Sequence, residues 1–350
     1  MATLIDLQSD TVTRPTQEMR AFMAKAPVGD EQKQEDPTVN ALQERVAALL
    51  GKEAALYLPS ATMANEIAIK VHTQPGDEVI ADRTAHIINA EAGGPAALSG
   101  VMVQALEGRR GVFSADQVEQ AIRREAPHYP RARLVSVEQT ANLGGGTVWP
   151  IEQLRSIVEV ARRHRLHTHL DGARIMNAVV ASGHPAPEHA RGYESVTFCL
   201  TKGLGCPVGA LIAGDRAFIA EARRLKHRFG GAMRQAGIIA AAGLYALEHH
   251  VERLAQDHTN AQILARGLAE IRGIEIDVAH VETNLVFFDV AGTGLTAEEV
   301  VDRLLARGVR VGAITRTQLR AVTHLDVSQA DVERAVSIMQ DVLGRARIGG

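Results

Sequence analysis

A lysine and an aspartate at the ends of two short apolar runs could carry out chemistry together. Lys202 follows the run Val196–Leu200 and precedes a Gly-Leu-Gly turn, and Asp171 ends the run His167–Leu170. Either charge alone is more commonly a solvated loop residue. A lysine amine forms a Schiff base with an aldehyde cofactor, however, and a carboxylate keeps the nitrogen of a pyridine ring protonated. The pair in this order therefore predicts a pyridoxal phosphate site.

Polar residues near other expected strand ends could complete this site. Ser60, Ala61 and Thr62 lie between an expected strand and an expected helix. Free backbone N–H groups and hydroxyls at such a helix N-terminus can hold a phosphate, although a plain serine N-cap is the commoner role. His86 follows another strand end. Its imidazole could stack on a cofactor ring or move a proton, and a hydrogen-bonded loop histidine is the simpler interpretation.

Three arginines are candidates for binding anionic groups. Arg174 and Arg320 could hold a carboxylate through two parallel hydrogen bonds, which suits an amino-acid substrate. Arg234 stands at the start of an expected helix after two glycines, where it could contact a phosphate, including one in a neighbouring subunit. The simpler interpretation of each is a surface arginine.

A metal-dependent hydrolase is the alternative from a different class. The pair His167 and His169 at a strand end is typical of the first metal ligands in barrel hydrolases, which need further ligands on later strands. His324 and Asp326 could serve, but the eightfold strand pattern of a barrel is not evident. We therefore expect no metal site.

The composition excludes several classes of protein. The chain has 350 residues, a formal net charge of −3 and only 3% aromatic residues, which argues against a nucleic-acid partner. No apolar run has membrane-spanning length, and no basic segment followed by an apolar stretch opens the chain. Its two cysteines, Cys199 and Cys206, form no spaced framework and are expected to be free. We therefore expect a cytoplasmic enzyme acting on a small molecule.

Short apolar runs alternate with helical patterns through the first two thirds of the chain. This alternation predicts an α/β fold, with a mostly parallel sheet covered by helices on both faces. The expected strands are Ala54–Leu58, Glu78–Ala81, Leu134–Val137, His167–Leu170, Val196–Leu200 and Val208–Ala213, and the expected helices are Ser60–Val71 and Ile151–Arg165.

The remainder predicts a smaller α+β domain. Met233–Ile271 is expected to be mainly helical and to bridge into it. Further elements are expected at Leu285–Val290 and Arg320–Thr323 (strands) and at Thr296–Arg307 and Ser328–Leu343 (helices). We accordingly predict two domains, residues 1–248 with the N-terminal segment and the cofactor site, and residues 249–350.

Several motifs resemble those of the L-threonine aldolases, in the aromatic amino acid beta-eliminating lyase/threonine aldolase group of fold type I (aspartate aminotransferase-like) pyridoxal phosphate enzymes. The resemblance covers nearly the whole chain, and several of its motifs are specific to this family. The matching runs are Leu7–Pro15, Glu35–Asn40, Leu58–Met63, His169–Arg174, Leu200–Gly205, Gly231–Gly237 and Arg320–His324.

The resemblance implies a role for each matching residue. It makes Lys202 the Schiff-base lysine, Asp171 the partner of the ring nitrogen and His86 the residue stacked on the ring. The implied phosphate ligands are Ser60, Ala61, Thr62 and, across a subunit interface, Arg234. The implied substrate-carboxylate ligands are Ser9, Arg320 and Arg174, the last also beside the cofactor. The implied assembly is a homotetramer with active sites shared between subunits.

The implied activity is retro-aldol cleavage of L-threonine, L-allo-threonine or a related β-hydroxy-α-amino acid to glycine and an aldehyde, with His86 as a candidate base. Departures from the family pattern gather around the substrate side chain. Ala141 stands where many members have a histidine that contacts the substrate hydroxyl, Lys33 and Gln34 replace a tyrosine–glycine pair, and Ala90 replaces a bulkier residue. A fold type I lyase or racemase with another substrate is therefore the nearest alternative.

Overall fold

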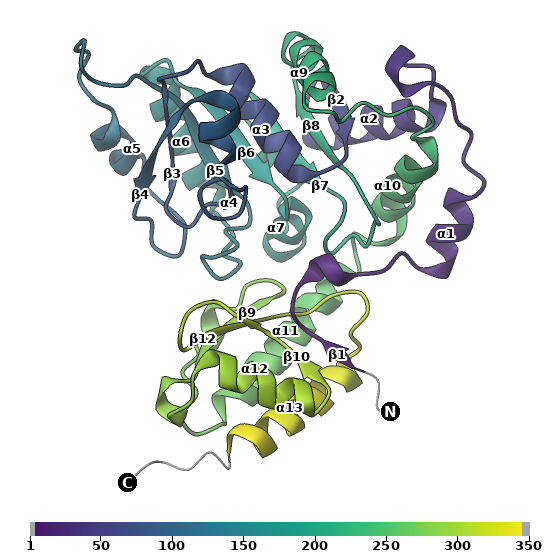
Figure 1. Ribbon diagram of the computed structural model, residues 1–350, viewed down its shortest axis with the longest axis vertical. Helices are drawn as coiled ribbons and strands as arrows, with labels where there is room; N and C mark the ends of the chain where they lie inside the picture. The colour runs from purple at the N-terminus through teal and green to yellow at the C-terminus, as the bar shows by residue number, and fades with distance from the viewer. Residues whose placement is uncertain (1–3, 345–350) are drawn as a thin grey trace.

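The computed structural model describes residues 4–344 as two lobes joined at a narrow waist (Figure 1). The large lobe contains a seven-stranded sheet in the order β2-β8-β7-β6-β5-β3-β4. All strands of this sheet except β8 run in the same direction, so the predicted, mostly parallel sheet is confirmed. The strands are β2 (Ala54–Leu58), β3 (Glu78–Asp82), β4 (Met102–Leu106), β5 (Ala132–Glu138), β6 (His167–Gly172), β7 (Ser195–Cys199) and β8 (Ala210–Gly214).

Each strand predicted for this lobe is present, and β4 is the one that the pattern missed. β4 lies at the edge of the sheet, and its residues are mostly exposed or half-buried, with Met102 55% exposed. An edge strand of this kind has no continuous apolar run, so its sequence carries little periodic signal.

Helices cover both faces of this sheet, as predicted. Along β2, Ala55 and Tyr57 point into one core and Leu56 and Leu58 into another, as the pleat requires. α3 and α9 cover the second of these faces, and α2, α6 and α10 cover the first. The helices of this lobe are α1 (Gln17–Met23), α2 (Pro37–Leu50), α3 (Ala61–His72), α4 (His86–Asn89), α5 (Ala115–Ala121), α6 (Ile151–Arg163), α7 (Ile175–Ser182), α8 (Ala186–His189), α9 (Arg216–Arg228) and α10 (Gly237–His249).

The small lobe has its own core and two small sheets. Strands β11, β12 and β9 form an antiparallel sheet in that order, and β1 pairs with β10 in parallel. The strands are β1 (Ile5–Asp6), β9 (Leu285–Asp289), β10 (Val309–Arg310), β11 (Gly312–Ala313) and β12 (Gln318–Val322), and the helices are α11 (Leu254–Ala269), α12 (Ala297–Ala306) and α13 (Gln329–Leu343).

The chain passes from one lobe to the other twice, near the first and the last residues of the large lobe. Ile5 and Leu7 pack in the core of the small lobe, so the N-terminal strand lies there although the next residues enter the large lobe. The predicted helical stretch 233–271 is two helices, α10 and α11, with a break after His249. Leu254, at the start of α11, belongs to the large core, and Leu264 of the same helix belongs to the small core. The predicted domain division at residues 248 and 249 stays a prediction.

In the part of the chain that the structure describes, every helix is too short or too polar to cross a membrane.

A buried ion pair ties the loop before α2 to the end of α9. Lys226 donates to the carboxylate of Glu31 over 2.6 Å, and both side chains are almost fully buried. The amide of Glu31 also donates to the carbonyl of Arg234, and Arg223 lies 3.6 Å from the same carboxylate. The loop around residue 31 and the segment that carries Arg234 are therefore held as one unit.

We expect Lys226→Met to lower the free energy of unfolding by about 3 kcal/mol, near the lower end of the range for a broken buried ion pair because Arg223 stays close to Glu31. Denaturant unfolding of the variant measures this loss. Glu119→Ala, which removes the solvent-exposed contacts of Glu119 with Arg163 and His164, is the control and should change stability by about 0.5 kcal/mol or less. Equal losses in the two variants would show that Glu31 does not depend on this lysine.

Candidate active site

Two of the predicted residues, Asp171 and Lys202, lie where parallel strands end, together with Glu138. Glu138 closes β5, Asp171 lies opposite it in β6, and Lys202 follows β7, which pairs with β6. The carboxyl ends of parallel strands form one edge of a sheet, and ligands of open α/β sheets bind at that edge. Lys202 and Arg174 line one small cavity there. The loop of Lys202 is fixed by Thr13, whose hydroxyl donates to the Lys202 carbonyl over 3.0 Å.

Asp171 is a buried carboxylate with two hydrogen-bond donors. Its Oδ1 accepts from the amide of Ala173 at 3.0 Å, and its Oδ2 accepts from Nδ2 of Asn65 at 2.8 Å. The side chain is only 3% exposed. A carboxylate has about four lone-pair sites, so one more N–H donor can bind to it. This geometry suits the ring nitrogen of a pyridinium.

The first turn of α3, where a phosphate site is predicted, has a capping serine and free backbone amides. Ser60 has extended backbone angles and caps the helix, with its Oγ accepting from the amide of Met63 at 3.2 Å. The amides of Ala61 and Thr62 lie in the first turn, where no helical carbonyl can accept from them. Gly231 packs so closely against Met63 that a Cβ there would lie 2.4 Å from its sulfur.

Arg234 lies in the segment that begins at Gly231, but its guanidinium points elsewhere in the single chain. Nη1 donates to Asp30 at 3.0 Å, and the side chain is 62% exposed. Its predicted phosphate contact therefore requires either a different rotamer or a phosphate on another subunit.

His86 begins α4 and is held by two glutamates. Its amide donates to Oε2 of Glu138 over 2.8 Å, and its ring Nδ1 lies 2.7 Å from Oε1 of Glu91. The hydrogen bond to Glu91 raises the pKa of His86, with smaller contributions from the charges of Asp171 and Glu138. Burial raises the pKa of Glu138 to about 7, and the neighbouring charge of Asp171 adds to this effect.

Arg174 is already engaged with an aspartate. Its Nε and Nη2 donate to the two carboxylate oxygens of Asp10 at 2.7 Å, and both residues are buried. Nδ2 of Asn284, from the small lobe, donates to the same carboxylate at 3.1 Å. Burial alone would raise the pKa of Asp10, but Arg174 outweighs it and holds that pKa well below its usual range. The two N–H groups of Nη1 and the second N–H of Nη2 are left to face a substrate.

Arg320 is the arginine with unused donors. It reaches from β12 toward the large lobe, where Nη1 donates to Oδ1 of Asn142 at 3.0 Å and Nη2 lies 3.5 Å from the carbonyl of Gln8. Its buried Nε has no hydrogen-bond partner among the described residues. The hydroxyl oxygen of Ser9, next to Gln8, accepts hydrogen bonds from the amide and the hydroxyl of Thr11. An orphaned guanidinium N–H beside the strand ends is what a substrate carboxylate would satisfy.

The predicted specificity residues do not gather at one place in the single chain. Ala141 is 3% exposed, and its Cβ faces Gly111, where an added Cβ would lie 2.7 Å away. Lys33 and Ala90 are exposed.

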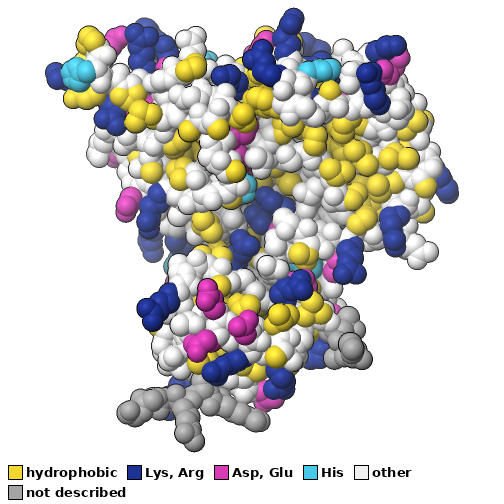
Figure 2. Space-filling model, in the orientation of Figure 1, with side chains coloured by type: hydrophobic (Ala, Val, Ile, Leu, Met, Phe, Trp, Pro, Cys, Tyr) yellow, Lys and Arg dark blue, Asp and Glu magenta, His cyan; other side chains and the backbone are white. Residues whose placement is uncertain are grey.

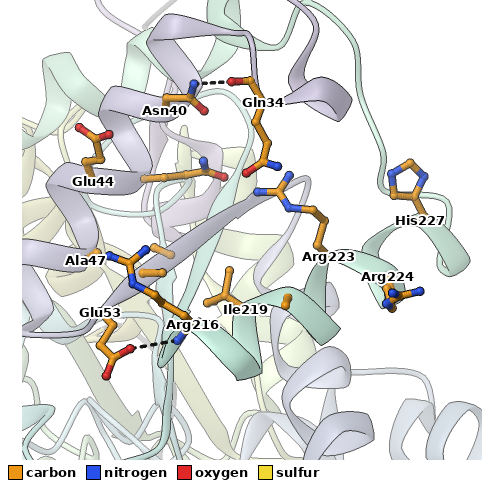
Figure 3. A pocket seen from close by; sticks show the side chains of 14 residues that line it. Gln34, Asn40, Glu44, Ala47, Glu53, Arg216, Ile219, Arg223, Arg224 and His227 are labelled. Carbon is orange, nitrogen blue, oxygen red and sulfur yellow. Dashed lines mark hydrogen bonds between the residues drawn. The ribbon is translucent and has the colours of Figure 1, made fainter.

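Gln34 lines a separate groove of about 830 Å³ between α2 and α9 (Figure 3). In this groove Gln34 points toward Arg223. Apart from Gln34, the residues that line this groove are not among the predicted site residues.

The residues considered as metal ligands of a hydrolase lie apart from one another in the structure. His169 uses both ring nitrogens, at 2.9 Å from Ser195 Oγ and 3.1 Å from Asn65 Oδ1, and burial lowers its pKa to about 4. His324 lies 2.8 Å from the carbonyl of Asp6 in the small lobe. The one group in residues 4–344 with metal-ligand spacing is His72, His167 and Glu194, at the opposite ends of the strands from Lys202. The four residues proposed for a metal site are therefore not brought together.

Sequence reasoning missed four polar residues of this site, namely Asp10, Asn65, Glu91 and Glu138. Each is buried or half-buried within the network around Asp171, His86 and Arg174. Asn65 lies in α3 five positions after Ser60. An amide on the buried side of an amphipathic helix was the available signal.

Comparisons with known proteins agree with this geometry. The sequence profile of the beta-eliminating lyase family matches residues 6–291. The low-specificity L-threonine aldolase of Escherichia coli O157:H7 is 42% identical over 343 residues, which are 98% of this chain and 100% of that protein. Low-specificity L-threonine aldolase 1 of Arabidopsis thaliana is 39% identical over 344 residues, 97% of this chain and 96% of that protein.

Solved structures share the fold. The threonine aldolase of Leishmania major superposes with a TM-score of 0.84 at 20% identity, over 97% of this chain and 99% of that one. The serine palmitoyltransferase of Sphingomonas wittichii superposes with a TM-score of 0.76 at 17% identity, over 97% and 87%. At these identities the likeness shows the fold alone, and the predicted fold class is confirmed.

We expect Asp10→Asn to lower the free energy of unfolding at pH 7 by about 3–5 kcal/mol, because Arg174 loses its buried partner. Arg174 depresses the folded-state pKa of Asp10 below its unfolded value, so the stabilisation is present above about pH 4 and is lost as the pH falls below it. Urea unfolding at several pH values should show the gap between wild type and variant narrowing in acid. A gap that is independent of pH would show that Asp10 acts through packing instead of charge.

Proposed function

Because this chain belongs to the beta-eliminating lyase family, with low-specificity L-threonine aldolases among its relatives, we propose that it cleaves L-threonine, L-allo-threonine or related β-hydroxy-α-amino acids to glycine and an aldehyde, with pyridoxal phosphate as cofactor. The observation that carries the proposal is the meeting of Lys202, Asp171 and the first turn of α3 at one edge of the sheet. The similarity over nearly the full length of both chains supports it.

The residues fit this cofactor. Pyridoxal phosphate, when bound, supplies an aldehyde that condenses with amines and a protonated ring that withdraws electrons from the bonds of Cα. Lys202 would offer the amine, and Asp171 would accept the N–H of the ring nitrogen. The amides of Ala61 and Thr62, with the hydroxyls of Ser60 and Thr62, would hold the phosphate. His86 would lie against the ring.

The substrate would be held by its carboxylate and deprotonated at its hydroxyl. Arg320 would bind the carboxylate through its unpartnered Nε and the second N–H of Nη2, with Arg174 and Ser9 nearby. His86 is a candidate to take the hydroxyl proton, directly or through a water. Glu91 raises the pKa of His86, which makes the imidazole a stronger base when it is neutral. Ala141 leaves the hydroxyl without an imidazole donor from this loop, which favours broad specificity.

A homotetramer with active sites shared between subunits is part of the proposal. Figure 2 shows hydrophobic side chains gathered on the face of the large lobe over α2 and α10. The exposed apolar residues include Phe22 of α1, 45% exposed, and Ile238 of α10, 50% exposed. Arg234 is exposed as well, as a ligand for a partner's phosphate would be. Two free buried thiols, Cys199 and Cys206, support a cytoplasmic location.

Lys202→Ala should abolish formation of glycine and acetaldehyde from threonine, because no other amine is placed to attach the cofactor. Product analysis of wild type and variant, with the exposed Lys25→Ala as a control, tests this expectation. Full activity in the Lys202 variant would remove the proposed site. Formation of 2-oxobutyrate and ammonia by the wild type, without glycine, would show instead that the enzyme eliminates water from threonine.

Arg320→Gln should raise KM for amino-acid substrates and leave the affinity for the cofactor nearly unchanged. Losing a bidentate carboxylate contact typically costs about 2–5 kcal/mol. Steady-state kinetics measures KM, and titration of the cofactor-free protein measures affinity for the cofactor. Arg316→Gln, an exposed position of the same lobe, is the control. An unchanged KM in the Arg320 variant would place the carboxylate site elsewhere.

A further inference from the structure

One buried amide connects the residues that we place on two sides of the cofactor ring. Asn65 is 1% exposed and lies on α3. Its Nδ2 donates to Oδ2 of Asp171 and to Oε1 of Glu91, both at 2.8 Å. The same oxygen of Glu91 lies 2.7 Å from Nδ1 of His86. An amide has only two N–H donors, and both are used in these contacts.

We propose that Asn65 is a positioning residue. It fixes the position of Asp171, the proposed partner of the ring nitrogen, relative to that of His86, the imidazole proposed to stack on the ring. This inference rests on the proposed function, which supplies the roles of those two residues. It adds a residue that touches neither cofactor nor substrate.

The opposite side of the amide shows that its orientation is fixed. Oδ1 of Asn65 accepts from the hydroxyl of Thr197 at 2.8 Å and lies 3.1 Å from Nε2 of His169. Exchanging the amide oxygen and nitrogen would set the NH₂ group against the Thr197 hydroxyl and set the amide oxygen against both carboxylates. The observed orientation gives Thr197 an acceptor and gives each carboxylate a donor.

The donors form a chain that runs in one direction. Burial lowers the pKa of His169 to about 4, so its ring is neutral and has a single N–H. With that N–H on Nε2, donating to Asn65, its Nδ1 must accept from the hydroxyl of Ser195 at 2.9 Å. Ser195 Oγ then accepts from Nε2 of His72, also at 2.9 Å. These donors all point along the chain toward Asn65 and, through its NH₂ group, toward Asp171.

The place of Asn65 on α3 links this network to the phosphate site. Ser60 caps the helix, and five residues rise about 7.5 Å along an α-helix. The same helix therefore carries the proposed phosphate-binding turn and the amide that orients Asp171.

Glu66, the residue after Asn65, lies beside Glu91, and burial raises the pKa of Glu66 to about 8. Glu66 is then mostly neutral at pH 7, and it is Oε1 of Glu91 that contacts Asn65 and His86.

The sharpest variant is Asn65→Asp, which keeps the size and the acceptor facing Thr197 and His169 and removes both N–H donors. Thr197→Val is the matched control, because it removes one bond to the same amide and leaves both donors in place. We would titrate each cofactor-free protein with pyridoxal phosphate and measure kcat and KM for threonine at saturating cofactor.

We expect Asn65→Asp to weaken cofactor binding at least tenfold and to lower kcat at least tenfold, with KM changed less than threefold because Arg320 is untouched. Thr197→Val should stay within threefold of wild type in all three quantities. Asn65→Leu, which is apolar and similar in size, should resemble Asn65→Asp and replaces it if that variant does not fold.

Cofactor affinity and kcat within threefold of wild type in the Asn65 variants would overturn the proposal. Equal losses in Asn65→Asp and Thr197→Val would also overturn it, since the effect would then come from packing alone. The cofactor titration does not depend on which amino acid is cleaved. A wild type that binds pyridoxal phosphate but does not cleave threonine would thus contradict the proposed function and leave this test intact.

Discussion

The bidentate pair between Arg174 and Asp10 is the interaction on which the arrangement of the lobes depends. Asp10 comes from the N-terminal segment, Arg174 from the turn after β6, and Asn284 of the small lobe donates to the same carboxylate. Removing two charges from water is costly unless the geometry is excellent and further hydrogen bonds satisfy the remaining atoms. Here both conditions are met, so the waist between the lobes is polar and well defined.

The ion pair with Asp10 also distinguishes Arg174 from Arg320, two arginines that the sequence predicted alike as carboxylate ligands. Arg174 follows β6 and Arg320 lies within β12, and a guanidinium at either place suits a carboxylate ligand. Two nitrogen atoms of Arg174 donate to Asp10, whereas the buried Nε of Arg320 has no hydrogen-bond partner among the described residues. The charge of Arg174 is therefore balanced by Asp10 inside the protein, whereas Arg320 keeps a donor that a proposed substrate carboxylate could use.

The sequence predicted Lys202 and Asp171 because their signal is local. A short apolar strand followed by a charged residue can be recognised within a few positions, and the alternation of such runs with helical patterns predicts the sheet. Asn65 and Asp171 are far apart in the chain, and so are Asp10 and Arg174. Contacts of that kind depend on the order of the strands, which no local pattern contains. The edge strand β4 and the break between α10 and α11 were missed for the related reason that burial decides them.

The N-terminal strand β1 gives the molecule a mechanical property. Because Ile5 and Leu7 pack in the small lobe, the described chain passes between the lobes twice, once after β1 and once at the start of α11. Two crossing points define a line. Rotation about that line stretches neither connection, whereas twisting or sliding of one lobe across the other strains at least one of them. The two connections thus allow one rotation of the small lobe, and a rotation of that kind would have to break the hydrogen bond from Arg320 to Asn142.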